Sequence, residues 1–191
     1  MKKKFLLDYL FLFGLAGVIV SLDQWTKWLV RSNLASEQMW APWEWLLPYA
    51  RIVNWHNTGI AFGMFQNMNT VFAILSIIVS LGIIYYFPQV PLNDWLVRLI
   101  LGVLLGGAVG NLIDRLVQGY VTDFVSVGTF PVFNVADSSI SVGVTVLIIG
   151  MWIRENREKR RAEKLIQEKK RLDAELSDPK ASPEDGPNVN G

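Results

Sequence analysis

The chain has 191 residues, of which 51% are hydrophobic and only 18% are charged, and its formal net charge is +1. In a soluble domain about a quarter of the residues are charged, so this composition favours a membrane protein. Because the sequence contains no cysteine, it excludes disulfides, thiolate metal sites and thiol catalysis. The sequence contains a single histidine, His56, so a zinc site or a serine–histidine catalytic pair would have few residues available to form it.

The first hydrophobic stretch follows three lysines, Lys2 to Lys4, an arrangement that secretory signal peptides share. Its apolar character continues through WTKWLV without a small-residue cleavage site, so we expect a membrane span over about residues 9–30. Asp23 lies four residues before Lys27, and the two side chains therefore share a helix face. They form either a local ion pair that holds the helix end or, as ionisable groups inside a membrane, part of a functional site.

Residues 31–68 form a long connection that is rich in tryptophan and irregular in pattern. An indole ring suits the membrane–water interface. We therefore interpret four tryptophans as interfacial anchors: Trp40, Trp43, Trp45 and Trp55. The alternation in IVNWHN predicts a short strand on the membrane surface, and His56 within it is expected to be a surface residue and not a catalyst.

Three more hydrophobic segments follow, over about residues 69–87, 96–115 and 132–153. Roughly 20 apolar residues cross the hydrocarbon core as a helix, so the sequence predicts four transmembrane helices. The third span carries glycines at four-residue spacing, at Gly102, Gly106 and Gly110. This pattern lets another helix approach closely.

Positive charge is concentrated at the two ends of the chain. Three of the 18 Lys and Arg residues are Lys2 to Lys4, and nine lie between Arg154 and Arg171. Because positive residues accumulate on the cytoplasmic side of a membrane, both termini are expected inside the cell, as is the 88–98 loop with Arg98. The connections at residues 31–68 and 117–131 are then expected outside.

The hydrophobic pattern divides the chain into a membrane domain, residues 1–153, and a charged cytoplasmic tail, residues 154–191. Residues 154–176 are rich in Glu, Lys and Arg and fit a solvated, helical extension, whereas the Pro- and Gly-containing end fits a disordered segment. We interpret the basic run as an orientation signal, with binding of anionic lipid as the alternative.

Polar side chains interrupt the last two spans. Asn111, Asp114 and Arg115 lie on one side of the third helix, where Arg115 can neutralise its neighbour Asp114. The fourth span begins with a second polar stripe, formed by Asn134, Asp137, Ser138 and Ser141. Such a stripe is expected to face the bundle interior or water.

Asp123 and Asp137 both lie toward the outer surface in this topology, and Gly128 and Pro131 allow the connection between them to double back. Two carboxylates that converge in a partly dehydrated site share one proton, and such a pair can activate water. Two aspartates in a membrane protein are just as often part of an ion or proton path, so the pattern leaves both hypotheses open.

Five motifs together resemble the lipoprotein signal peptidase family, also called signal peptidase II. They are LDQWTK at 22–27, NTGIAFGMF at 57–65, GNLIDR at 110–115, VTDF at 121–124 and FNVADSSISVG at 133–143. The resemblance covers roughly residues 10–150 and excludes the tail. Thr122 and Ile60 stand where relatives commonly carry Val and Ala, and neither replaces a polar functional group.

The resemblance implies an all-α integral membrane protein with four transmembrane helices and both termini cytoplasmic. It also implies a small outer-face β-cradle and a surface helix that fit residues 31–68. In this family's pattern Asp123 and Asp137 are the catalytic dyad of an aspartic protease. Six further positions match residues that line or support the site: Asp23, Asn57, Asn111, Asp114, Arg115 and Asn134.

The activity that the resemblance implies is removal of the signal peptide from prolipoproteins whose cleavage-site cysteine carries a diacylglyceryl group. It places the enzyme in the bacterial cytoplasmic (inner) membrane, with the active site toward the outer (periplasmic) face. The expected partners are lipid-modified prolipoproteins, membrane lipids and globomycin-type inhibitors; neither nucleic acid nor a metal or organic cofactor is expected. The alternative is a small ion- or proton-coupled transporter, which would more naturally place its aspartates near the midplane and often has repeated halves that this sequence lacks.

Overall fold

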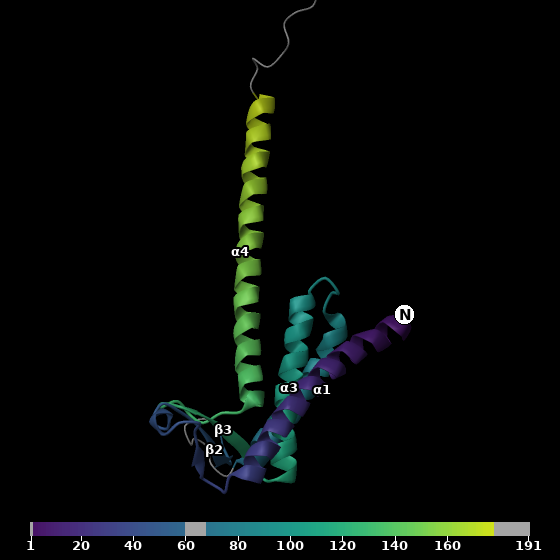
Figure 1. Ribbon diagram of the computed structural model, residues 1–191. Helices are drawn as coiled ribbons and strands as arrows, with labels where there is room; N and C mark the ends of the chain where they lie inside the picture. The colour runs from purple at the N-terminus through teal and green to yellow at the C-terminus, as the bar shows by residue number, and fades with distance from the viewer. Residues whose placement is uncertain (1, 60–67, 178–191) are drawn as a thin grey trace, which may run out of the picture. The chain divides into compact units, whose positions relative to one another are not determined.

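The computed structural model describes residues 2–59 and 68–177 (Figure 1). Two parts of the predicted organisation lie outside the described residues: the NTGIAFGMF motif from Ile60 onward, and the end of the tail after Ser177. The chain divides into two compact units, residues 1–147 and residues 148–191. Every predicted site residue belongs to the first unit.

Four long helices make up most of the described chain: α1 (Lys2–Asn33), α2 (Asn69–Tyr86), α3 (Trp95–Val117) and α4 (Val135–Ser177). Within the described residues, four helical segments are long and apolar enough to cross a membrane, in agreement with the four predicted spans, and the second of them continues from α2 through residue 89. The segments are Leu6–Asn33, Asn69–Gln89, Trp95–Val117 and Val135–Asp173. A helix suits lipid because it satisfies its backbone polar groups internally.

The glycines of α3 bring it close to α1. A Cβ atom at Gly102 would lie 2.7 Å from Cδ2 of Leu15, and one at Gly106 would lie 2.6 Å from Cβ of Ile19. The predicted role of this stripe in close helix packing is therefore confirmed. The apolar core of this region draws on α1, α2, α3 and the 3₁₀ helix η3 (Phe87–Gln89). Its buried members are Leu12, Ala16, Ile83, Phe87, Val90, Leu101 and Leu105.

Arg98 is not a loop residue, contrary to prediction, because α3 begins at Trp95. Its side chain is buried, and Nη2 lies 2.6 Å from Oδ1 of Asp8 on α1. The guanidinium also lies 4.3 Å from the ring centroid of Phe87 and donates to the carbonyl of Val90 at 3.1 Å. A buried cation requires such partners, and this one ties α1 to the beginning of α3.

A small antiparallel sheet has the strand order β1 (Met39–Trp40), β2 (Ala50–Asn57) and β3 (Val121–Val127). Strand β2 confirms the strand predicted in IVNWHN. Strand β3 comes from the connection between α3 and α4, where the sequence predicts no strand. The predicted all-α class therefore lacks this sheet, and one of the three strands lies outside residues 31–68. In the described part of that region, the helical element is one 3₁₀ turn, η1 (Glu44–Leu46).

Strand β3 is bounded by two glycines in the left-handed region, Gly119 at φ 79° and Gly128 at φ 53°. These positions favour glycine because a Cβ atom would clash with the backbone. After the second turn, Phe133 pairs with Val125 through backbone hydrogen bonds of 2.8 and 3.0 Å. Helix α4 begins after this pair, at Val135.

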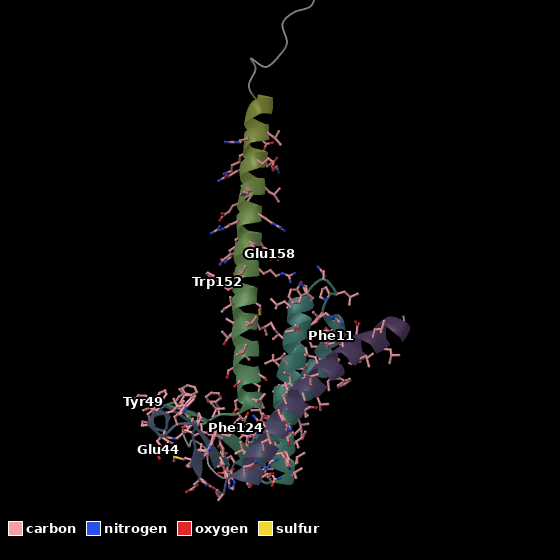
Figure 2. The ribbon with its side chains drawn as sticks, viewed as in Figure 1. Phe11, Glu44, Tyr49, Phe124, Trp152 and Glu158 are labelled. Carbon is pink, nitrogen blue, oxygen red and sulfur yellow. The ribbon has the colours of Figure 1, made fainter. Side chains whose placement is uncertain are left out.

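The second unit is helical from residue 148 to Ser177, within α4. Its side chains project from the helix, as the labelled Trp152 and Glu158 do in Figure 2. The helix carries exposed ion pairs at i,i+4 spacing, with 2.8 Å between Lys159 Nζ and Glu155 Oε1. This agrees with the predicted solvated, helical extension.

Candidate active site

Asp123 lies within β3, opposite Trp55 of β2, and is only 1% exposed. The strand is buried from Val121 through Phe124, so successive side chains on both of its faces are shielded. The carboxylate accepts two amide hydrogen bonds, one from Asn57 Nδ2 to Oδ2 at 2.8 Å and one from Asn134 Nδ2 to Oδ1 at 2.7 Å. These donors replace the water that a buried carboxylate has lost.

Asp137 lies in the first turn of α4, where it and Asn134 cap the helix. Oδ1 of Asn134 accepts the backbone N–H of Asp137 at 2.8 Å, and Oδ2 of Asp137 accepts the backbone N–H of Asn134 at 3.2 Å. This reciprocal pair is a capping box, which satisfies N–H groups that have no partner inside the helix. The local sequence NVAD therefore both starts α4 and fixes its carboxylate.

Asparagine side chains connect the two aspartates. Asn134 holds Asp123 through its side-chain amide and Asp137 through its backbone N–H. Asn111 of α3 provides a second link, because its Nδ2 donates to Oδ1 of Asp137 at 2.8 Å and its Oδ1 accepts from Nδ2 of Asn134 at 3.1 Å. The two carboxylates thus belong to one hydrogen-bond network.

Both aspartates line a cavity of about 460 Å³. Its polar lining consists of Asn57, Asn111, Arg115, Asp123, Asp137, Ser138 and Ser141. Its apolar lining consists of Val121, Phe130, Pro131, Val132, Phe133, Ile140 and Val142, with Gly59 completing the wall. A concave apolar site with a few convergent polar groups is typical of a binding or active site.

The pKa of Asp123 is raised to about 7, first by burial and then by the negative charge of Asp137, while hydrogen bonds from Asn57 and Asn134 partly oppose the rise. A carboxyl pair that retains one proton can offer an acid and a base at once.

Asp23 and Asp114 do not line the cavity; they belong to a buried ionic cluster. Nζ of Lys27 lies 2.8 Å from Oδ2 of Asp23 and 3.1 Å from Oδ2 of Asp114, which confirms the predicted Asp23–Lys27 pair. The prediction that Arg115 neutralises Asp114 is wrong, since the partners of Asp114 are Lys27 and, at 3.5 Å, Arg31. Consecutive helix residues point about 100° apart and do not face each other.

Arg115 lies in the wall of the cavity instead. Its Nη1 donates to the carbonyl of Asn111 at 3.4 Å, and its Cζ lies 5.7 Å from the ring centroid of Phe72. The guanidinium therefore brings a positive charge to the same cavity as Asp123 and Asp137.

Two residues of the buried cluster, Gln24 and Arg31, were not among the predicted site residues. Gln24 Nε2 has three acceptors: Asp23 Oδ2 at 3.2 Å, Gly110 O at 3.0 Å and Asp114 Oδ1 at 3.1 Å. Arg31 Nη1 donates to Oγ1 of Thr122 at 3.0 Å. Arg31 could have been found, because it lies one helical turn after Lys27 on the same face, and Gln24 lies within the LDQWTK motif.

His56 is exposed on β2, as expected, and its ring stacks on that of Tyr120 with 3.9 Å between centroids. Within residues 2–59 and 68–177, no group of three or more His, Cys, Asp or Glu side chains could hold a metal ion.

The family model described as signal peptidase (SPase) II matches residues 15–153. The lipoprotein signal peptidase of Halalkalibacterium halodurans is 41% identical over 148 residues, which cover 75% of this chain and 92% of that protein. The lipoprotein signal peptidase of Bacillus subtilis is 36% identical over 154 residues, which cover 76% of this chain and 96% of that protein.

Two solved structures, each described as a bacterial membrane enzyme, have the same fold. Each is 30% identical to this chain and covers 72% of it, with TM-scores of 0.67 and 0.64. The aligned regions make up 85% and 89% of those chains. Since the family model matches well over half of the sequence and the relatives agree with it over most of their length, this chain belongs to the signal peptidase II family.

Proposed function

We propose that this chain is an aspartic endopeptidase that removes the signal peptide from diacylglyceryl-modified bacterial prolipoproteins, cleaving before the lipidated cysteine. The observation that carries the proposal is that Asp123 and Asp137 line one cavity and are joined through Asn134. Membership of the signal peptidase II family and the names of the relatives support the substrate class.

In the proposed reaction a water molecule lies between the two carboxyl groups. Asp137, as the ionised member, takes a proton from this water, whose oxygen attacks the carbonyl carbon of the residue before the cysteine. Asp123 donates a proton to the carbonyl oxygen; its pKa of about 7 favours it as the holder of the shared proton. The C–N bond then breaks: the cysteine nitrogen leaves with the proton that Asp137 took up, and a hydroxyl of the intermediate returns a proton to Asp123 as the new carboxyl group forms.

The polar side chains around the dyad have separate proposed roles. Asn57, Asn111 and Asn134 each donate to an aspartate oxygen, so we assign them to orienting the carboxylates. Arg115 contributes positive charge to the cavity wall, where it would stabilise the partial negative charge that develops on the carbonyl oxygen while the water attacks.

We place the protein in the bacterial cytoplasmic membrane, with both termini cytoplasmic and the dyad toward the outer face. The basic residues Lys2 to Lys4 and those between Arg154 and Arg171 support this orientation. Acyl chains held in the outer leaflet would keep the scissile bond near the dyad and lower the entropic part of the barrier. The apolar part of the cavity suits a signal-peptide side chain or a globomycin-type cyclic inhibitor.

The test is cleavage of a prolipoprotein by the purified full-length chain in detergent, with and without the diacylglyceryl group. We expect cleavage of the lipidated form alone, its inhibition by a globomycin-type peptide, and its loss in the Asp137→Asn variant. Cleavage of neither form by a folded protein would contradict the proposal. Ion flux into proteoliposomes would then test the alternative, in which the same aspartates form a transport path.

A further inference from the structure

Lys27 lies at the centre of a buried polar cluster. Its ammonium nitrogen lies 2.8 Å from Asp23 Oδ2, 3.1 Å from Asp114 Oδ2 and 2.9 Å from Asn111 Oδ1. Lys27 and Asp23 are 0% exposed and Asp114 is 1% exposed. An ammonium group has three N–H donors, so this cluster uses all of them. Because charges are costly to bury, such a cluster is expected to have a structural or functional role.

The first arm of the cluster reaches the strand that carries Asp123. Oδ2 of Asp114, which Lys27 contacts, also accepts the backbone N–H of Thr122 at 2.9 Å. Thr122 immediately precedes Asp123 in β3. The position of Asp123 is therefore tied to Lys27 through one carboxylate and one backbone hydrogen bond.

The second arm reaches the helix that carries Asp137, and it has the same construction. Oδ2 of Asp23 contacts Lys27, while Oδ1 of Asp23 accepts the backbone N–H of Ala136 at 2.9 Å. Ala136 immediately precedes Asp137 in the first turn of α4. One lysine thus connects the two segments that bear the cavity's aspartates.

The third arm fixes the orientation of Asn111. A lysine can only donate, so the Asn111 atom that faces Lys27 must be its oxygen. This oxygen also accepts from Asn134 Nδ2 at 3.1 Å, and the Asn111 amide nitrogen is left to donate to Asp137 at 2.8 Å. Reversing the amide would turn its NH₂ group toward the ammonium.

We propose that Lys27 is a positioning residue that, through Asp23 and Asp114, holds Asp123 and Asp137 at the separation that the reaction requires. The inference rests on the proposed function of the dyad. Neither Lys27 nor its two carboxylate partners line the cavity. Loss of the contacts between Lys27 and these carboxylates should therefore lower kcat and leave KM unchanged, because it displaces reacting groups without removing a substrate contact.

A second buried ion pair offers a matched control, since a role in folding alone would give both pairs the same effect. Asp8 and Arg98 also join α1 to α3, at 2.6 Å, and both are largely buried. Arg98 precedes Asp114 by 16 residues in α3, which corresponds to about 24 Å of helix. This pair therefore lies far from the cluster that holds the dyad.

The experiment compares two charge-balanced double variants, Lys27→Met/Asp114→Asn and Asp8→Asn/Arg98→Met, in thermal unfolding and in cleavage of a lipidated prolipoprotein. We expect both to unfold at lower temperature than the unmodified chain. Only the Lys27 variant should lose kcat, by about 100-fold, as a displacement near 1 Å can cause, with KM changed by less than about twofold. Equal kcat values in the two folded variants would overturn the proposal.

A second pair of variants perturbs the cluster without removing a charge, should the Lys27 double variant fail to fold. A Cβ atom at Gly110 would lie 2.7 Å from Oδ2 of Asp23, the oxygen that Lys27 holds, whereas one at Gly102 would lie 2.7 Å from a methyl carbon of Leu15. Gly110→Ala should lower kcat at least about tenfold relative to Gly102→Ala, since misplaced catalytic groups are costly. Equal kcat values would contradict the positioning role.

A structural measurement separates this inference from the proposed function. If the unmodified chain fails to cleave the substrate, the proposed function fails, but the tie can still be judged from crystal structures. We expect the distance between the carboxyl groups of Asp123 and Asp137 to differ between the unmodified chain and the Lys27 double variant. If that variant does not fold, the same comparison is made with the Gly110→Ala variant. An unchanged distance, in either the active or the inactive case, would overturn the inference.

Discussion

The side-chain amide of Asn134 lies 2.7 Å from Oδ1 of Asp123, although Asn134 belongs to the start of α4 and Asp123 to a strand of the sheet. The same residue caps α4 through its side-chain oxygen, which accepts the backbone N–H of Asp137 at 2.8 Å. One asparagine thus combines a structural role, through its oxygen, with contact to the proposed dyad, through its nitrogen. The two roles can be separated by mutation.

Asn134→Ser and Asn134→Ala should differ in stability but not in activity. Serine is a good N-cap and alanine is a poor one, so the alanine variant should lose about 1 kcal/mol more unfolding free energy. Neither side chain can donate an amide hydrogen bond to Asp123, so kcat should fall in both. Thermal unfolding and prolipoprotein cleavage measure the two effects. A serine variant with unchanged kcat would show that the Asn134 amide does not support the dyad.

Asp123→Asn and Asp137→Asn should each reduce kcat by about 10³-fold or more, because an amide can act neither as the general base nor as the carboxylic acid. Both variants should remain folded and membrane-inserted. Asp173→Asn, on an exposed position of the second unit, is the matched control and should cleave at the unmodified rate. Near-normal cleavage by either dyad variant would disprove the assignment of that residue.

The rate of cleavage should fall as pH rises through about 7, because Asp123, with its pKa raised to about 7, then loses the proton that the proposed reaction needs. A pH–rate profile of kcat/KM measures this limb, and its midpoint belongs to the coupled pair. A rate that keeps rising well above pH 7 would show that no proton shared by the dyad is required.

The raised pKa of Asp123 also makes the stability of the folded protein depend on pH. The folded state binds the Asp123 proton more tightly than the unfolded chain, so the stability that this group contributes is complete below the ordinary pKa of 3.8 and is lost as pH rises to about 7. Asp123→Asn removes this dependence. Its unfolding temperature, relative to that of the unmodified chain, should therefore be higher at pH 8 than at pH 5. If the unfolding temperatures of the two proteins changed by the same amount between pH 5 and pH 8, the raised pKa of Asp123 would be contradicted.

Removal of residues 154–191 should leave kcat within about twofold of the full chain, since no transition-state contact is lost. Every residue assigned to the dyad or its support lies in the first unit, and the family match ends at residue 153. Cleavage by the shortened protein in detergent measures the effect, with a chain that lacks only residues 178–191 as the control. A large loss of activity in the first protein alone would place part of the catalytic machinery in the tail.

Local pattern by itself determined the helical framework of this protein. Apolar segments of membrane-spanning length predict α1 to α4, and the alternation in IVNWHN predicts β2, because length and periodicity are properties of consecutive residues. The motifs likewise drew attention to Asp123 and Asp137. The resemblance that they carry supplied the site residues, and hydropathy alone would not have selected these two aspartates.

Only the tertiary structure decided the partners of the polar groups. The sequence favours Arg115 as the neighbour of Asp114, yet the cations beside Asp114 are Lys27 and Arg31, from another helix. In the same way, β3 is held by pairing with β2, for example between Val121 and Asn57. Buried charges and unpaired backbone groups must find partners wherever the fold brings them. Lys27, Arg31 and Asn57 lie dozens of residues from the groups that they contact, a distance over which local periodicity carries no information.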